Sequence, residues 1–342
     1  MEENSMKNYN ISVIRGIAVC MIVSCHVFQG LHIELAWWMN VGVQIFLCMS
    51  GWLYGKKNIG STKKWYIRRY LKIMIPMWVM LTMVLIVLKF THTGSYSIFS
   101  AIASYLGIAG FQTIPELTHT WFITYILFCY LITPLLEKID ITNNTSQLKF
   151  TGSLVGIIVC LEVLYVGKII GMLPQYVSVY VIGYYMARNE YINGKDIRSI
   201  YMKLFGMLTI TLFPVRLFVQ YGNIKVENAY WEILRGQIMG WHHLLIGISL
   251  FLVMLTFFEK RNMKLSKLID WLDNYSYYIY LVHQIFILNT FSLLHITDFL
   301  ILNLVIILFA IIIASMILEK ITHIINDKLE IRGIYNVKKY NG

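Results

Sequence analysis

Long uninterrupted apolar segments dominate this chain and limit what it can fold into. Residues 300–318, for example, contain no charged side chain. An apolar helix of about twenty residues, rising 1.5 Å per residue, crosses the roughly 30 Å hydrocarbon core of a bilayer. The composition agrees, because 58% of the residues are hydrophobic and only 14% are charged, against about 25% charged residues in a typical soluble domain. We therefore predict an all-α, polytopic integral membrane bundle and exclude a soluble globular protein.

The apolar segments predict about ten transmembrane helices in one membrane domain that covers residues 1–342. The predicted spans are 11–31, 37–55, 72–91, 119–136, 150–168, 172–187, 203–221, 241–258, 276–295 and 299–318. Residues 319–342 are predicted to form a cytoplasmic tail. The N-terminus lacks the basic region and cleavage site of a removable signal peptide, so we expect the first span to be retained.

Basic residues predict the orientation, because cytoplasmic loops of membrane proteins are enriched in Lys and Arg. The connection between the first and second spans has no Lys or Arg. The connection after the second span carries seven of them: Lys56, Lys57, Lys63, Lys64, Arg68, Arg69 and Lys72. Both termini are therefore predicted to be cytoplasmic. Residues 95–112 are apolar enough to suggest a further span, but a crossing there would turn the later basic loops outward. We predict an extracytoplasmic interfacial or re-entrant helix instead.

The formal net charge of +11 does not indicate nucleic-acid binding here, since the apolar blocks are those of a membrane protein. The five cysteines all fall in apolar segments and form no CxxC pair, so neither a disulfide framework nor a zinc site is expected. The sequence also has no HExxH motif, and we predict no metal site.

Arg15 and His26 are the ionisable residues of the first predicted span. Eleven residues at 100° each bring both side chains to one helix face, about 16 Å apart along the axis. A guanidinium suits a phosphate-bearing ligand, and an imidazole can accept a proton from a hydroxyl group near neutral pH. Equally, Arg15 could reach lipid headgroups and His26 could form a hydrogen bond between helices.

Two more charged residues lie within predicted spans, Glu162 in the fifth and Arg216 in the seventh. A charge inside the membrane usually has a partner. We expect Glu162 either to pair with Arg216 or to orient His26, and Pro214 to kink the seventh span near Arg216. A buried ion pair that only joins two helices is the structural alternative.

An ordered set of short motifs resembles the membrane-bound acyltransferase 3 family of O-acyltransferases. The motifs are a first-span Arg and His, a Ser-Gly pair, a basic entry to the third span, a His-x-Trp segment and a Ser-Tyr…Tyr-Leu-x-His segment. They stand here as Arg15 and His26; Ser50 and Gly51; Arg68, Arg69 and Pro76; His119 and Trp121; and Ser276, Tyr280, Leu281 and His283. One departure is that Arg69-x-x-Lys72 replaces the Arg-x-x-Arg often found in the family, which keeps the charge but loses one guanidinium.

The resemblance implies an acyl-CoA-dependent O-acetyltransferase of the cell (plasma or inner) membrane. Such an enzyme moves an acyl group, usually acetyl, from cytoplasmic acetyl-CoA to a hydroxyl of a cell-surface or exported polysaccharide. It needs acyl-CoA as a co-substrate and no bound cofactor. Its expected partners are a glycan or other hydroxyl acceptor, the lipid bilayer and glycan-assembly proteins, with no nucleic acid.

The same resemblance suggests roles for individual residues. His26 is expected to be the general base, with Glu162 and His283 as further catalytic candidates. A second set is expected to bind acyl-CoA: Arg15, Arg68, Arg69 and Lys72. A third set is expected at the acceptor site or in its support: His119, Trp121, Arg216, Ser276 and Tyr280. The basic cluster could instead serve only topology and anionic lipid binding. A polytopic transporter or a polysaccharide-export component without acyl transfer is the alternative function.

Overall fold

A computed structural model describes residues 9–139, 144–167, 171–193, 197–222, 229–259 and 266–331 of the chain. About 85% of these residues are helical, and none of them forms a strand. The predicted all-α fold is thus confirmed for the described part of the chain. Helices suit an apolar environment because they satisfy their backbone hydrogen bonds internally.

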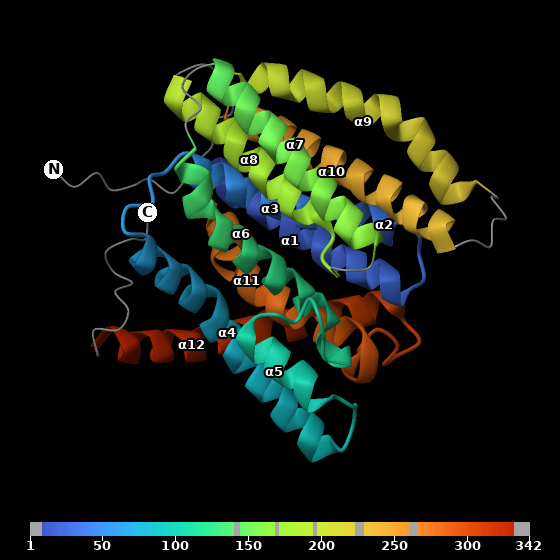
Figure 1. The fold of residues 1–342 in the computed structure, drawn as a ribbon. Helices are drawn as coiled ribbons and strands as arrows, with labels where there is room; N and C mark the ends of the chain where they lie inside the picture. Colours follow the sequence, from blue (N-terminus) through green and yellow to red (C-terminus); the bar gives the residue numbers. More distant parts are fainter. Residues whose placement is uncertain are drawn as a thin grey trace. The chain divides into compact units, whose positions relative to one another are not determined.

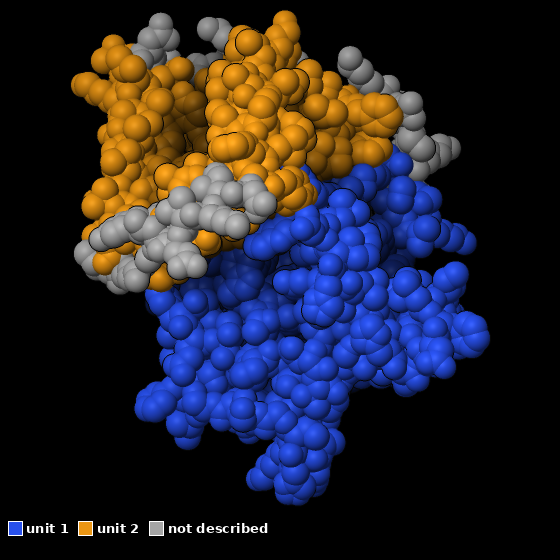
Figure 2. Space-filling view, turned by 90° about the vertical axis from the view of Figure 1, so that its right-hand side faces the viewer, with its two compact units in different colours: residues 1–40, 61–127, 263–342 blue, residues 41–60, 128–262 orange. Residues whose placement is uncertain are grey.

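The chain divides into two compact units (Figure 2), and each collects segments that are distant in sequence. Unit 1 comprises residues 1–40, 61–127 and 263–342. Its elements are α1 (Tyr9–Gly30), α2 (Ala36–Met39), α4 (Thr62–Thr91), α5 (Ile98–Leu106), η1 (Pro115–Thr120), α11 (Lys267–Ile287), η2 (Asn289–Phe291) and α12 (Leu300–Ile331).

Unit 2 comprises residues 41–60 and 128–262. It contains α3 (Val41–Gly55), α7 (Asn144–Val166), α8 (Pro174–Asn193), α9 (Arg198–Tyr221) and α10 (Ala229–Glu259). Helix α6 (Trp121–Glu137) begins in unit 1 and ends in unit 2. The single membrane domain stays a prediction beside this division into two packing units.

Among the residues that the structure describes, seven helical segments are long and apolar enough to cross a membrane. They are Tyr9–Gly30, Thr62–Thr91, Pro115–Glu137, Thr145–Val166, Arg198–Tyr221, Trp231–Glu259 and Leu300–Leu329. The other three predicted spans correspond to α3, α8 and α11. Helix α3 has only 15 residues, about 22 Å of rise, because α2 and a turn interrupt the apolar segment. Helices α8 and α11 have 20 and 21 residues, but neither contains an uninterrupted stretch as apolar as those of the seven.

Several predicted boundaries differ from the structure, mostly where a helix continues beyond its apolar core. Helix α4 begins at Thr62, ten residues before the predicted span, and α12 continues to Ile331. Helix α11 begins at Lys267 and ends at Ile287, whereas the sequence predicted 276–295. Hydropathy detects the membrane-embedded part of a helix, and polar turns that extend it into water or the headgroups escape detection.

Residues 95–112 contain α5, a nine-residue helix of about 13 Å, too short to span a bilayer. It follows the C-terminal end of α4 (Figure 1). Its exposed residues Ile98, Phe99, Ile102 and Leu106 form one apolar face. Ser100 and Ser104, by contrast, are buried. This amphipathic pattern is typical of a helix that lies at the membrane surface, as the sequence predicted.

Glycines allow close contact between α3 and α8 in unit 2. A Cβ atom on Gly51 would lie 2.0 Å from the backbone oxygen of Tyr180, and one on Gly183 would lie 2.4 Å from that of Cys48. Gly51 and Gly55 form a GxxxG pattern on α3, with Gly55 meeting the backbone oxygen of Tyr184. Small residues at this spacing let membrane helices approach each other backbone to backbone.

We expect Gly51→Ala to destabilise the protein by about 1–3 kcal/mol, because the added methyl group forces α3 away from α8. Thermal unfolding of the purified protein in detergent measures the effect. Gly152→Ala on α7 is the matched control, since nothing lies within 4 Å of a Cβ there. Equal unfolding temperatures for the two variants would contradict the packing role of Gly51.

The predicted orientation can be tested at the two ends of α4. In a variant whose five native cysteines are replaced, we expect Ser95→Cys to react with an impermeant maleimide in intact cells. Lys64→Cys should react only after permeabilisation, because the basic start of α4 is predicted to be cytoplasmic. The reverse labelling pattern would overturn the orientation.

Candidate functional site

Three histidines from separate parts of the sequence meet inside unit 1. His26 comes from α1, His119 from η1 and His283 from α11. The ring centroids of His26 and His283 are 4.9 Å apart, and those of His119 and His283 are 5.2 Å apart. We refer to these three residues as the histidine cluster. The sequence assigned His26 and His283 to catalysis and His119 to the acceptor site, and the structure brings all three together.

His283 is fully buried, and its protonation pattern follows from its hydrogen bonds. Its Nδ1 lies 2.7 Å from the backbone oxygen of Tyr280 and 3.2 Å from that of Ile279. A carbonyl oxygen can only accept a hydrogen bond, so Nδ1 carries the hydrogen and Nε2 keeps its lone pair. Within the part of the chain that the structure describes, this buried Nε2 has no hydrogen-bond partner. His283 therefore offers a basic nitrogen inside the cluster.

His119 is buried too, but both of its ring nitrogens are engaged. Nε2 donates to the backbone oxygen of Leu281 at 3.0 Å, and Nδ1 contacts Oε1 of Gln284. The same Oε1 accepts the backbone N–H of His119 at 2.8 Å, while Nε2 of Gln284 donates to Thr118. This arrangement fastens η1 to α11 and leaves neither nitrogen of His119 available for a ligand.

His26 is the most accessible member of the cluster. Its side chain is half-buried, and its Nδ1 lies 2.9 Å from Oε1 of the exposed Gln29, one helical turn further along α1. With the amide oxygen facing the ring, Nδ1 donates and Nε2 keeps its lone pair. His26 thus combines partial exposure with an Nε2 lone pair, whereas His119 and His283 are buried.

Arg15 is held by a carboxylate that the sequence analysis did not identify. Its Nη1 forms an ion pair with Oδ1 of Asp273 on α11, and Ser12 donates to Oδ2 of the same carboxylate at 3.0 Å. The Asp273 side chain is 2% exposed and that of Arg15 is 28% exposed. Asp273 thus holds Nη1 of the guanidinium, and the Arg15 side chain stays partly exposed.

The two contacts between α1 and α11 set the register of these helices. Arg15 meets Asp273, and His26 meets His283, so positions eleven residues apart on α1 face positions ten residues apart on α11. The helices therefore run parallel, with the two contacts separated by about 16 Å. The predicted common face of Arg15 and His26 is confirmed, because both side chains face α11. A search of the sequence for an acidic residue at the same depth as Arg15 could have identified Asp273.

The other motif residues of unit 1 surround the cluster and support it. Tyr280 donates its hydroxyl to the backbone oxygen of His119 and packs against the His119 ring at 5.4 Å. Ser276 is buried and bonds the backbone oxygen of Asp273. Trp121 packs edge to face against Tyr125, with centroids 5.3 Å apart. Of these side chains, Tyr280 supports the cluster directly, through its contacts with His119.

The predicted acyl-CoA-binding residues Arg68, Arg69 and Lys72 lie near the start of α4, where Lys72 is exposed and the two arginines are half-buried. Tyr277 on α11 donates to the backbone oxygen of Ile73 at 2.8 Å. Tyr277 is one helical turn from Asp273, and Ile73 directly follows Lys72. The basic part of α4 therefore packs on α11 near the level of the Arg15–Asp273 pair.

Glu162 and Arg216 lie in unit 2, and the structure does not bring them together. Glu162 accepts a hydrogen bond from the indole N–H of Trp241 at 2.9 Å. Arg216 is fully buried and bonds Oε1 of Gln220 at 2.9 Å and Nε2 of His243 at 3.1 Å. A Glu162–Arg216 ion pair, one of the two alternatives that the sequence left open for Glu162, is not among these contacts.

A family model described as an acyltransferase domain matches residues 8–320, nearly the whole chain. No curated protein and no solved structure matches it. The matched region includes the histidine cluster, the Arg15–Asp273 pair and the basic part of α4. In the described ranges of the chain, no group of three or more His, Cys, Asp or Glu residues could hold a metal ion.

We expect Asp273→Ala to lower the free energy of unfolding by about 1–3 kcal/mol, because it leaves Ser12 and Arg15 without their shared acceptor. A double-mutant cycle with Arg15→Ala, measured by chemical unfolding in detergent, isolates the pair. The double variant should lose less stability than the sum of the two single variants. Strict additivity would show that the two side chains do not stabilise each other.

Proposed function

Since this chain belongs to the acyltransferase 3 family and carries membrane-spanning helices, we propose that it transfers an acyl group from acyl-CoA to a hydroxyl of a glycan. The acyl group is proposed to be acetyl, and the acceptor a cell-surface or exported polysaccharide. The cell (plasma or inner) membrane is the proposed location. The single observation that supports this proposal most is the half-exposed His26 beside the buried His283 inside the matched domain.

In the proposed reaction, Nε2 of His26 takes the proton from the acceptor hydroxyl as its oxygen attacks the thioester carbonyl carbon. The new C–O bond forms, the C–S bond breaks, and the CoA thiolate leaves. The proton held by His26 then passes to that thiolate, which releases free CoA. His283, whose buried Nε2 has no hydrogen-bond partner among the described residues, is the proposed group that supports the charge on His26 during this step.

Arg15 is proposed to bind the phosphates of acyl-CoA with the edge of the guanidinium that Asp273 does not occupy. Arg68, Arg69 and Lys72 on α4 would add positive charge at the same level. The separation of about 16 Å between Arg15 and His26 is comparable to an extended pantetheine arm. A donor bound in this way would present its thioester beside His26.

The ion pair with Asp273 and the contact with His283 weigh against the purely structural interpretations of Arg15 and His26. Arg15 does not simply extend to lipid headgroups, because a buried carboxylate holds it. The hydrogen bond of His26 goes to Gln29 on its own helix, which weighs against the interpretation of His26 as a hydrogen bond between helices. A transporter would not require a histidine cluster and an arginine held by a carboxylate on the same face of α1.

We expect His26→Ala to reduce acyl transfer by about 10²–10⁴-fold, the usual contribution of a general base. Purified protein in nanodiscs is given acetyl-CoA and host glycan, and release of free CoA is followed. His295→Ala, at an exposed histidine outside the cluster, is the matched control and should keep full activity. Unfolding temperature and gel filtration confirm that both variants fold.

Near-normal turnover of His26→Ala would exclude His26 as the base. Failure of the unmodified protein to release CoA with any acyl donor and glycan would instead favour the transporter or export-component alternative.

A further inference from the structure

Gln29 is, within the described ranges of the chain, the residue that hydrogen-bonds the ring of His26. Its Oε1 lies 2.9 Å from Nδ1 of that ring, and the two residues are three positions apart on α1. Long side chains of an α-helix point back toward its N-terminus, so the side chain of Gln29 lies over the turn that carries His26. The sequence of α1 alone therefore provides this contact.

The contact decides which nitrogen of His26 carries the hydrogen. In a neutral imidazole, one nitrogen is a donor and the other keeps a lone pair. A carboxamide oxygen can only accept, so Nδ1 of His26 donates to Gln29 and Nε2 keeps its lone pair. His283 follows the same pattern, because its Nδ1 donates to the backbone oxygen of Tyr280 at 2.7 Å. In His283 the backbone fixes the tautomer, whereas in His26 a side chain does.

The partner of His26 is neutral, unlike the carboxylate that orients the histidine of a Ser-His-Asp triad. A carboxylate in this place would stabilise the imidazolium form, which has no lone pair to accept a proton. In the part of the chain that the structure describes, no carboxylate hydrogen-bonds His26, His119 or His283. A carboxamide thus orients the ring of His26 without favouring its charged form.

The other titratable groups around His26 do not bond its ring. Helix α1 packs against α11 and α2, and α2 has no titratable side chain. From α11, His283 faces His26 at 4.9 Å between ring centroids, with His119 on its other side at 5.2 Å. The Arg15–Asp273 pair lies about 16 Å away along α1. The tautomer of His26 therefore depends on Gln29.

From these contacts we infer that Gln29 positions His26 for proton transfer. Its carboxamide holds the hydrogen on Nδ1 and so leaves the Nε2 lone pair for the acceptor hydroxyl. When the proton moves from that hydroxyl to Nε2, the imidazolium that forms keeps its Nδ1–H bond to Gln29. Gln29 acts through His26 and is a positioning residue. The effect on catalysis rests on the proposed acyl transfer, whereas the effect on the tautomer does not.

¹⁵N NMR of histidine-labelled protein in lipid bilayers reads the tautomer directly, because protonated and unprotonated ring nitrogens differ in chemical shift. The signals of His26 are identified by their loss in His26→Ala. We expect hydrogen on Nδ1 in the unmodified protein, and a mixture of both tautomers in Gln29→Leu, which keeps the size of the side chain but has no acceptor. Hydrogen on Nε2 in the unmodified protein, or an unchanged tautomer in Gln29→Leu, would overturn the inference.

The rate of acyl transfer across pH, measured in nanodiscs with acetyl-CoA and host glycan, tests the consequence. Gln29→Leu should lower kcat by about 10–100-fold, as does loss of a group that orients an imidazole, and leave KM for acetyl-CoA unchanged. Gln29→Glu restores an acceptor but adds a charge that stabilises the imidazolium. It should keep most of the maximal rate and move the acidic limb of the pH–rate profile upward by about one unit or more. A purely structural contact would leave that limb in place.

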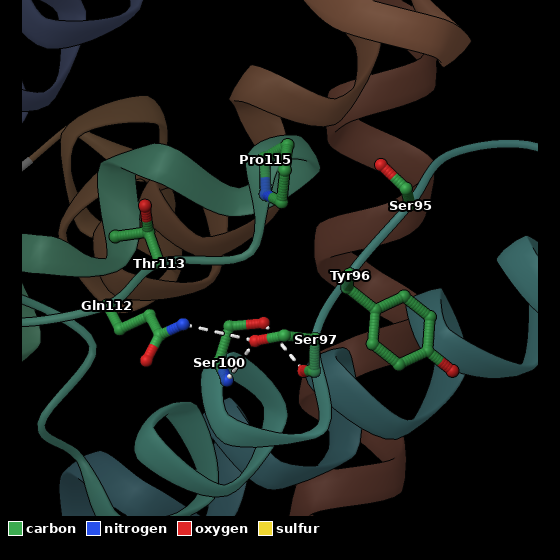
Figure 3. A pocket seen from close by; sticks show the side chains of 7 residues that line it. All are labelled: Ser95, Tyr96, Ser97, Ser100, Gln112, Thr113 and Pro115. Atoms are coloured by element: carbon green, nitrogen blue, oxygen red, sulfur yellow. Dashed lines mark hydrogen bonds between the residues drawn. The ribbon is translucent and has the colours of Figure 1, made fainter.

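Gln112→Leu is the matched control. Gln112 is also an exposed glutamine of unit 1, and its amide donates to Ser97 at 3.1 Å at a surface pocket (Figure 3). This variant should keep kcat and the pH profile.

The two experiments separate the role of Gln29 from the proposed function. If the unmodified protein transfers acyl groups but Gln29→Leu keeps a normal kcat, or Gln29→Glu keeps an unmoved acidic limb, the positioning role is wrong and the function stands. If the tautomer changes as expected but the unmodified protein transfers no acyl group, the proposed function fails and the control of the tautomer by Gln29 stands.

Discussion

The buried carboxylate of Asp273 is the constraint on which the candidate site depends. Burying a carboxylate is costly unless a charge and hydrogen bonds compensate it, and Arg15 and Ser12 supply both from a single face of α1. This requirement fixes α1 and α11 in one register. Ten or eleven residues further along each helix, the same register brings His26 onto His283. The Arg15–Asp273 ion pair and the histidine cluster therefore both follow from the packing of α1 against α11.

Helix packing in the two units relies on different devices. In unit 2, Gly51, Gly55 and Gly183 let α3 and α8 approach until backbone atoms touch. In unit 1, polar side chains join the helices, and Gln284 and Tyr280 fasten η1 to α11 through His119. Apolar side chains gain little by leaving lipid for protein, so close backbone packing and hydrogen bonds provide the specificity of both units.

The sequence predicted the helical class and the common face of Arg15 and His26, because both follow from period and hydropathy alone. It did not predict Asp273, which precedes the expected start of the ninth span and thus looked like a loop residue. The count of ten spans stays a prediction, because seven helices of the described residues are long and apolar enough to span a membrane. Helix α3 is short, and α8 and α11 lack a sufficiently apolar stretch. His119 was expected near the acceptor, and only its hydrogen bonds show that both nitrogens are engaged. Spacing within one helix is readable from sequence, whereas the partner on another helix is not.

The charge distribution of unit 1 accords with the proposed acyl-CoA donor, which is a polyanion. Arg15 and the basic part of α4 place positive charge near one level of α11, where Tyr277 bonds the backbone of Ile73. The buried Asp273 holds the guanidinium of Arg15 against α11, and a charge inside a membrane helix bundle usually has such a partner. Because Arg15 and His26 share one face of α1 about 16 Å apart, phosphates bound at Arg15 would leave the thioester end of the proposed donor beside the histidine cluster.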